Sequence, residues 1–328
     1  MFSPPGFDGC SWPRNDKNSR KGQPGKLGYD RAKFFNLSKM ETFYFQPKAF
    51  GYHPNNAYSL ALASELAYER DQQKAQQRGK DWGFEQMLFF DRGGTQAVLL
   101  YDADKIIVTF RGTEPDVLDD WITDIKIRKT TGPGGNVHRG FKEALNWIWL
   151  DVEKAIEAIR EAVPKEKQQT LWFAGHSLGG ALATLATALC KFNEQPFAVH
   201  GLYTYGQPRV GSEKFAAAFN GVFKSQTFRF VNNADIVTRV APSICDYGHV
   251  GQIKYFDKDG TCKSDTDLSW WSTFWDRVEG DLDHYRNCSP KGRMPNSIAD
   301  HDLSGQYIPR LKRHREEWEA SQSAVPQA

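Results

Sequence analysis

The chain has 328 residues, of which 40% are hydrophobic and 25% are charged, a composition typical of a globular protein with a sizeable core. Its 42 basic and 40 acidic residues nearly balance, and no long basic stripe occurs, which argues against a nucleic-acid-binding protein. Eighteen apolar residues never occur in succession, so we expect no transmembrane helix. The N-terminus lacks the apolar core of a secretory signal. The compartment is therefore unknown: a cytoplasmic location is the default expectation, while export by another route or a removed leader stays open.

The first 50 residues are rich in Pro, Gly, Lys and Asn and show little periodicity. We expect them to form a loosely structured N-terminal arm that lies on the body of the protein. Its candidate anchors are aromatic residues: Phe34, Phe35, Phe43, Tyr44 and Phe45. From Pro54 to Arg70 the apolar residues recur at helical spacing. Residues 96–101 and 105–110 then predict two strands joined by a hairpin turn at 102–104.

Strands and helices are expected to alternate through the rest of the chain. The predicted elements are a long helix over 141–162, a strand over 170–173, a helix over 178–193, a strand over 199–205, a helix over 213–223, and strands over 227–231 and 252–256. This alternation favours an α/β fold with a mainly parallel sheet and helices on both faces. We expect a single domain over 51–312 with an insertion at about 257–296, followed by a C-terminal tail at 313–328.

A serine in a glycine-flanked turn stands out in the middle of the chain. Residues 171–183 read LWFAGHSLGGALA, which is an apolar strand, a sharp turn at Ser177 and an alanine-rich helix. This is the setting of a nucleophile elbow, which exposes a serine Oγ above a sheet. Gly175 and Gly179 suit the turn because its strained backbone brings the flanking residues close together. Leu178 opens the helix, so its backbone N–H can bind an oxyanion.

A serine nucleophile needs a histidine to take its proton and a carboxylate to orient that histidine. Asp235 is the best candidate acid, because it follows the apolar strand at 227–231 and catalytic loops lie at the carboxyl ends of such strands. An ordinary surface turn is the alternative interpretation of its Asn-Asn-Ala-Asp segment. His301 is favoured over His249 as the base, and both stay open at this point. We expect His284 to be solvated and His176, inside the elbow, to make hydrogen bonds in the core.

Seven motifs occur in the order that characterises one hydrolase family. They are IVTFRGT (107–113), DWITD (120–124), VHRGF (137–141), GHSLGG (175–180), YGQPRVG (205–211), NNADIV (232–237) and Asp300-His301. Together they resemble the class 3 lipase family, in a bacterial or plant-like branch rather than among the fungal members. The resemblance implies the α/β-hydrolase fold, with Ser177 as nucleophile, Asp235 as orienting acid and His301 as general base. It also implies Thr113 as a second oxyanion donor beside Leu178.

Two segments are candidates for contact with substrate. The stretch that matches the lid of the fungal members, Glu114–Asp120, is short and acidic, with only Val117 and Leu118 apolar. This polarity favours soluble or short-chain esters. The second segment is a predicted helix at 268–278 with the aromatic residues Trp270, Trp271, Phe274 and Trp275. Such a helix suits a lipid interface, although packing of its aromatic side chains on the body explains the pattern slightly better.

The expected function is carboxylic ester hydrolysis by a serine hydrolase of the lipase type, acting on acylglycerols through an acyl-enzyme. Phospholipase A1 activity and feruloyl or short-chain esterase activity are the alternatives, and an inactive lipid-binding scaffold is a remote one. The chemistry requires no metal and no organic cofactor. The expected partners are a lipid or other ester substrate and, transiently, a lipid interface. The oligomeric state does not follow from the sequence.

Overall fold

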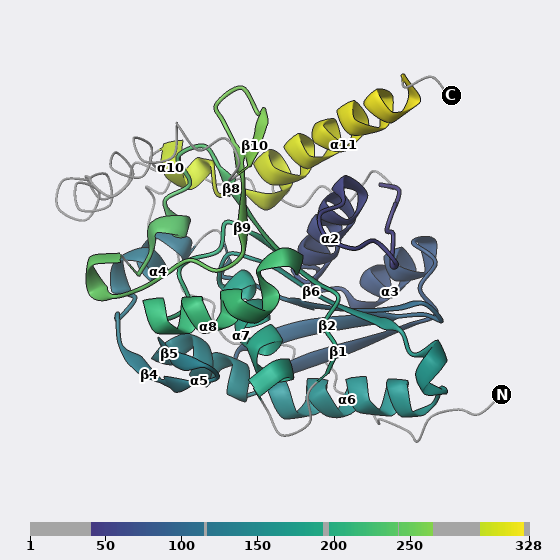
Figure 1. Ribbon diagram of the computed structural model, residues 1–328, viewed down its shortest axis with the longest axis horizontal. Coiled ribbons are helices and arrows are strands. Elements are labelled where there is room, and N and C mark those ends of the chain that lie inside the picture. The colour runs from purple at the N-terminus through teal and green to yellow at the C-terminus, as the bar shows by residue number, and fades with distance from the viewer. Residues whose placement is uncertain (1–40, 115–116, 193–196, 242, 265–295, 325–328) are drawn as a thin grey trace, which may run out of the picture.

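A central sheet of eight strands organises the computed structural model, which describes residues 41–114, 117–192, 197–241, 243–264 and 296–324 (Figure 1). The strands follow one another across the sheet in chain order: β1 (Gln86–Arg92), β2 (Thr95–Tyr101), β3 (Lys105–Phe110), β6 (Thr170–His176), β7 (Gly201–Tyr205), β8 (Thr227–Asn232), β9 (Gln252–Phe256) and β10 (Cys262–Ser264). A separate hairpin pairs β4 (Lys129–Gly132) with β5 (Gly135–His138). Within the large sheet, β3, β6, β7, β8 and β9 run parallel, and the antiparallel strands β1, β2 and β10 flank them. This mainly parallel sheet confirms the expected fold class.

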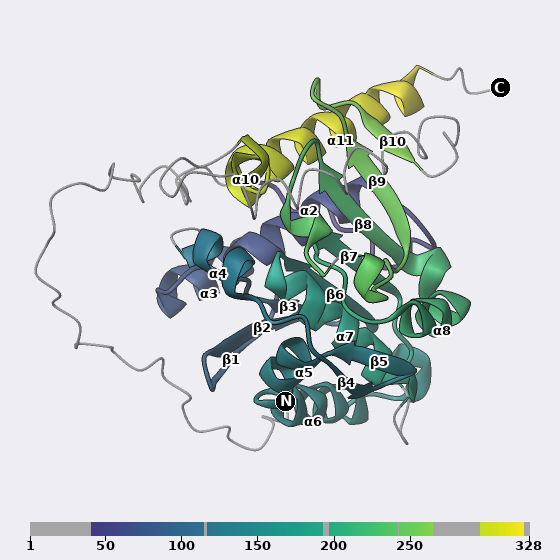
Figure 2. The ribbon, with the colours of Figure 1, turned by 90° about the vertical axis from the view of Figure 1, so that its left-hand side faces the viewer.

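Helices cover both faces of the sheet (Figure 2). The helices are α2 (Pro54–Leu66), α3 (Gln72–Asp81), α4 (Leu118–Asp124), α5 (Arg139–Asn146), α6 (Trp149–Glu161), α7 (Leu178–Phe192), α8 (Glu213–Phe223), α10 (Asn296–Ala299) and α11 (Ile308–Ser323). α2 and α11 pack together on one face, and α5 to α8 cover the other. No helix in the described part of the chain has the length and apolar character needed to cross a bilayer.

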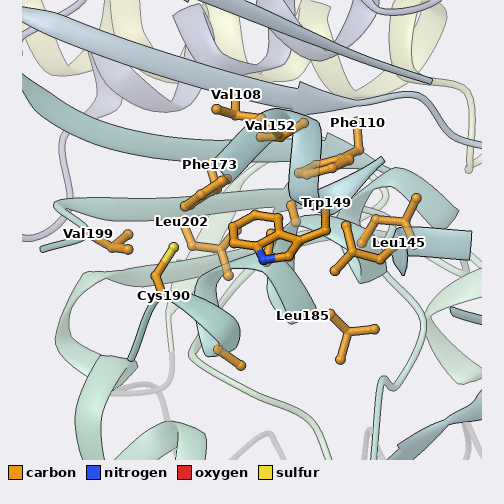
Figure 3. Close-up of a cluster of buried hydrophobic side chains, with 14 of the residues drawn as sticks. Val108, Phe110, Leu145, Trp149, Val152, Phe173, Leu185, Cys190, Val199 and Leu202 are labelled. Carbon is orange, nitrogen blue, oxygen red and sulfur yellow. The ribbon is translucent and has the colours of Figure 1, made fainter. Parts of the chain in front are cut away.

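The two faces of the sheet support two separate hydrophobic cores. In β2, Ala97 and Leu99 point into the core beneath α5 to α8, whereas Val98 and Leu100 point into the core beneath α2 and α11. Figure 3 shows part of the first core, where Trp149 lies among side chains from the sheet and α7. Because successive strand residues point to opposite faces, strands buried on both sides are apolar throughout. This continuous apolar character is what made the central strands predictable.

The predicted hairpin is confirmed by β2 and β3, which pair antiparallel. The single long helix expected over 141–162 is wrong, because α5 and α6 are separate helices. Between them the N–H of Trp147 and that of Ile148 bond to carbonyls three residues back, which tightens and ends α5. Ile148 and the adjacent Trp149, which lie at the break, are both buried.

The described N-terminal residues pack as the expected arm does, whereas the expected C-terminal tail is largely helical. Phe43 stacks on Trp82 with ring centroids 4.9 Å apart, and Phe45 meets the edge of Trp172 at 5.0 Å, as expected for anchors of an arm. Phe34 and Phe35 lie outside the described residues. Residues 313–323, expected in a C-terminal tail, form most of α11 and are continuous with the body through Leu311, which is fully buried.

Candidate active site

Ser177 lies at the junction of β6 and α7, as the elbow pattern predicts. Its φ of 58° is in the left-handed region, which costs a non-glycine residue roughly 1 kcal/mol or more. A Cβ at Gly175 would come within 2.3 Å of the backbone of Gly179, and a Cβ at Gly179 within 2.1 Å of the Phe110 carbonyl oxygen. The two glycines therefore allow the strand, the turn and the helix to approach this closely.

His301 and Asp235 meet directly although 66 residues separate them in the chain. His301 Nδ1 lies 2.8 Å from Asp235 Oδ2 and 3.0 Å from Oδ1, and both side chains are buried. The backbone N–H of Val237 donates to Asp235 Oδ1 at 2.9 Å, which fixes the carboxylate just after β8. The structure thus brings together the predicted acid and the predicted base. His249, the other candidate base, has both ring nitrogens enclosed near Arg229 and Arg209, and its pKa is lowered by burial and by those charges.

The two reacting atoms of the proposed pair make no hydrogen bond to any described residue. Ser177 Oγ and His301 Nε2 are both buried and both unpartnered. The imidazole of His301 packs on that of His176 with centroids 4.4 Å apart, so it lies beside the residue that precedes Ser177. Neither atom is engaged by another described group, so both are available for a proton transfer from the hydroxyl to the ring nitrogen.

His176 belongs to the scaffold of the site, as expected. Its Nδ1 lies 3.0 Å from the Tyr68 hydroxyl and its Nε2 lies 2.7 Å from the His301 carbonyl oxygen. Burial and the neighbouring His301 lower the pKa of His176 well below its usual value, so the ring is neutral. It therefore ties the elbow to the loop that carries His301.

The predicted oxyanion segment runs beside the elbow. A Cβ at Gly112 would lie 2.5 Å from the His176 carbonyl oxygen and 3.1 Å from Ser177 Cβ, so the backbone before Thr113 directly adjoins the serine. Glu114 forms ion pairs with Arg111 and, at 2.9 Å, with Arg70, and these pairs hold the end of the segment that contains Thr113. Leu178 is the first residue of α7, where backbone N–H groups lack helical acceptors.

Three contacts that the sequence did not predict hold the Asp235 and His301 loops together. The Tyr307 hydroxyl donates to Asp235 Oδ2 at 2.6 Å. The Asp300 carboxylate accepts from Asn233 Nδ2 at 2.9 Å and from the Ala234 N–H at 3.2 Å. Asp300 is part of the last motif, next to His301, but no sequence pattern predicts that its carboxylate binds the loop at Asn233 and Ala234.

A pocket of about 460 Å³ adjoins Leu178. Its lining comprises the apolar residues Trp121, Ile125, Phe141, Ala144 and Leu178, together with Lys126, Arg128, His138, Arg139, Gly140 and Glu143. His138 stacks on Phe141 at 4.0 Å, and its Nδ1 accepts the Phe141 N–H at the start of α5. Burial lowers the pKa of His138 to about 4, so it contributes a neutral wall.

α4 packs beside the segments that carry Asp235 and His301. Leu118 and Ile122 are buried against Ile236, Val237, Val240 and Ile298, which flank Asp235 and His301 in the chain. The apolar face extends to Trp121 and Ile125, beyond the acidic stretch that ended at Asp120. The effect of the acidic stretch on substrate preference stays a prediction. Val117 is exposed, and Trp270, Trp271, Phe274 and Trp275 lie outside the described residues.

Potential metal ligands do not cluster in the described ranges. In them no group of three His, Cys, Asp or Glu side chains is arranged to hold a metal ion. The segment Asp257–Gly260 is a turn, in which Asp257 Oδ1 accepts the N–H groups of Asp259 and Thr261.

Comparison with known proteins extends these observations. A family model described as Lipase (class 3) matches residues 107–244, a range that contains Thr113, Ser177 and Asp235 but not His301. The chain is 34% identical over 156 residues to the secreted mono- and diacylglycerol lipase 1 of Fusarium solani, covering 47% of this chain and 44% of that protein. It is 27% identical over 248 residues to triacylglycerol lipase OBL1 of Arabidopsis thaliana, covering 60% and 48%. The chain thus spans less than half the length of these two relatives.

A solved lipase from Rhizopus microsporus var. chinensis has the same fold, with a TM-score of 0.56 at 22% identity, covering 77% of this chain and 88% of that one. The central sheet and the helices on both faces are therefore those of an α/β-hydrolase. The low identities to fungal proteins fit a branch apart from the fungal members. Residues 107–244 of the chain therefore match the class 3 lipase family, to which the seven motifs and the fold also point.

Proposed function

We propose that this protein is a carboxylic ester hydrolase that cleaves lipid esters, with acylglycerols as the first expected substrates. The observation that carries the proposal is the buried pair of unpartnered atoms, Ser177 Oγ and His301 Nε2, backed by the hydrogen bond from His301 to Asp235. A serine, a histidine and a carboxylate gathered at one site are the parts of a charge-relay system.

The proposed reaction has two steps, acylation of Ser177 and hydrolysis of the acyl-serine. Ser177 Oγ attacks the ester carbonyl carbon while its proton passes to His301 Nε2. The tetrahedral intermediate then breaks its bond to the alcohol oxygen, which takes the proton and leaves. Water attacks the resulting acyl-serine and gives a proton to His301. Collapse of the second intermediate releases the carboxylic acid and returns the proton to Ser177 Oγ.

The N–H groups of Leu178 and Thr113 are the proposed oxyanion donors. Leu178 stands at the positive end of the α7 dipole, and the close approach of Gly112 to Ser177 supports a place for Thr113 beside the same oxygen. Loss of one such donor typically lowers kcat by about 10²–10³-fold.

The pocket beside Leu178 supports an acyl chain as the bound group. Its lining includes the apolar side chains of Phe141, Trp121 and Ile125 together with Leu178, the proposed oxyanion donor. The printed names of the Fusarium and Arabidopsis relatives, which specify mono-, di- and triacylglycerols, agree with this chemistry.

α4 is proposed as the lid of the site. Ser177 is fully buried and His301 is 2% exposed, so a lipid ester reaches them only after a covering element moves. α4 is the candidate because its buried side chains, Leu118 and Ile122, rest on the segment that follows Asp235. Trp121 and Ile125 would join the surface offered to a lipid when α4 lifts.

A phospholipid ester is the second candidate substrate. Lys126, Arg128 and Arg139 line the same pocket, and Lys126 and Arg128 are exposed. Positive side chains of this kind suit a phosphate group at the mouth of an acyl pocket.

Hydrolysis across a substrate panel tests the proposal. The panel contains p-nitrophenyl butyrate, a triacylglycerol emulsion, phospholipid vesicles and a feruloyl ester, each measured for the native chain and for Ser177→Ala. We expect the native chain to release fatty acid from acylglycerol, and Ser177→Ala to lose about 10⁴-fold or more in kcat with its fold intact by circular dichroism. Equal activity in the two proteins would overturn the mechanism, and faster release from phospholipid than from acylglycerol would select the second candidate.

A further inference from the structure

The Asp235 carboxylate accepts hydrogen bonds from three directions. His301 Nδ1 and the Tyr307 hydroxyl both meet Oδ2, at 2.8 and 2.6 Å, while the Val237 N–H meets Oδ1 at 2.9 Å. Tyr307 has no exposed surface, and its hydroxyl also accepts the backbone N–H of Asn232 at 3.0 Å. This hydroxyl is therefore fixed as an acceptor toward β8 and as a donor toward the same oxygen that orients the imidazole.

A π-helical turn, Leu303–Tyr307, brings Tyr307 to this position. In an α-helix, side chains six residues apart would diverge by roughly 120°, so His301 and Tyr307 would not face one carboxylate. The wider turn is held by Asp302, whose Oδ1 accepts the N–H groups of Ser304 and Gly305 at 3.1 Å. Ser304 Oγ in turn donates to the buried Glu65 of α2 at 2.7 Å.

We infer that Tyr307 is a positioning residue for the reaction, acting through Asp235. Its donated hydrogen bond fixes the carboxylate in the plane that His301 needs and takes up part of the charge on Oδ2. Without it, the carboxylate holds a proton more strongly and binds the charged imidazole more strongly. Both effects move the onset of base catalysis to higher pH. The inference rests on the proposed function, because it assigns His301 as the base.

Other charged and titratable groups surround the pair, and each stays in place when the Tyr307 hydroxyl is removed. They are His176 at the end of β6, Asp300 and Asp302 on either side of His301, Glu65 on α2, and Arg310 on α11, which interacts with Asp300. A shift in the pH profile on loss of one hydroxyl therefore reports the contact to Asp235.

Tyr307→Phe in the full chain tests the inference, with Tyr203→Phe as the matched control. Tyr203 is equally buried, and its hydroxyl also accepts one backbone N–H, from His53, and donates to one carbonyl oxygen, that of Gly51. For Tyr307→Phe we expect kcat/KM on p-nitrophenyl butyrate to fall about 10-fold. We also expect the acidic limb of the pH profile of kcat/KM to move up by about half a pH unit. The control keeps the native profile.

Two further readouts separate this inference from the proposed function. The rate of Ser177 labelling by a small fluorophosphonate should show the same shift in its acidic limb, whichever ester the protein prefers. The far-downfield proton resonance of the His301–Asp235 hydrogen bond should move in Tyr307→Phe and not in Tyr203→Phe, even if no ester in the panel is cleaved. An acidic limb and a proton resonance that match those of the control would overturn the inference. Failure of the native chain to cleave any ester or to react with the fluorophosphonate would instead count against the proposed function.

Discussion

Gly206, at the end of β7, shows how closely the backbone encloses the proposed triad. Its φ is +60°, and a Cβ there would lie 2.5 Å from His301 Cε1 and 2.7 Å from Asp235 Oδ2. Both side chains are buried, so a methyl group has no room without displacing the imidazole or the carboxylate. The absence of a side chain at this one residue is thus a condition for the His301–Asp235 contact.

Gly206→Ala is therefore expected to lower kcat by about 100-fold, because a misplacement of about 1 Å in catalytic geometry has effects of that size. Gly94→Ala is the matched control, since Gly94 has a φ of +79° and a Cβ there would meet nothing within 4 Å. Both variants bear a backbone strain of roughly 1 kcal/mol, and thermal unfolding should show it in both. Steady-state rates should fall only in Gly206→Ala, and equal rates in the two would refute the steric argument.

At the same scale, the sequence could single out Ser177, Asp235 and His301 because each lies in a local pattern tied to chemistry. The structure adds that Asp235 and His301 are in contact, while their catalytic roles stay a prediction. Tyr307 could not be found in this way. Its contact depends on a π-helical turn and on the packing of α11, neither of which leaves a periodic signal in the sequence.

Among the elements, those buried on both sides could be predicted and those at the margins could not. β3, β6, β7 and β8 are buried along almost their whole lengths and are rich in apolar residues, a composition that marks interior strands. β1 is an edge strand with a half-buried pattern, and α3 buries only Ala75 and Gly79, so neither was predicted. The local composition of a segment predicts whether it is buried. It does not predict where a helix ends because of tertiary packing, as happens between α5 and α6.

α4 is the element that we propose controls access to the site. Leu118 is buried against the segment after Asp235, and burial of a leucine side chain contributes roughly 1.5–3 kcal/mol to the covering position. Leu118→Ser should therefore favour the open position and raise the rate of p-nitrophenyl butyrate hydrolysis in monomeric solution by up to about tenfold. Val117→Ser is the control, because Val117 is 46% exposed. A rate in Leu118→Ser that only follows the loss of folded protein would make α4 a structural element rather than a lid.

Across the whole molecule, imidazoles are enclosed on both sides of the sheet and around the elbow. His138 and His176 are buried, the ring nitrogens of His249 are enclosed, and the pKa of each of the three is lowered with burial as the largest cause. These rings are neutral in the folded protein, whereas in the unfolded chain they titrate near pH 6.5. The fold therefore binds fewer protons than the unfolded chain in mildly acidic solution.

The free energy of unfolding should consequently fall as the pH is lowered from 7.5 to 5.5. Below pH 6.5 the unfolded chain gains protons that the folded protein excludes, so each ring contributes a loss on the order of 1 kcal/mol over this range. The buried carboxyls of Glu65, Asp300 and Asp302 have raised pKa values and oppose the trend, because they bind protons more readily in the folded protein than in the unfolded chain. Urea unfolding at the two pH values measures the change. His138→Asn, whose side chain can still accept the Phe141 N–H, should reduce the pH dependence by about 1 kcal/mol. An unfolding free energy that is the same at both pH values would show that these imidazoles are protonated in the folded protein.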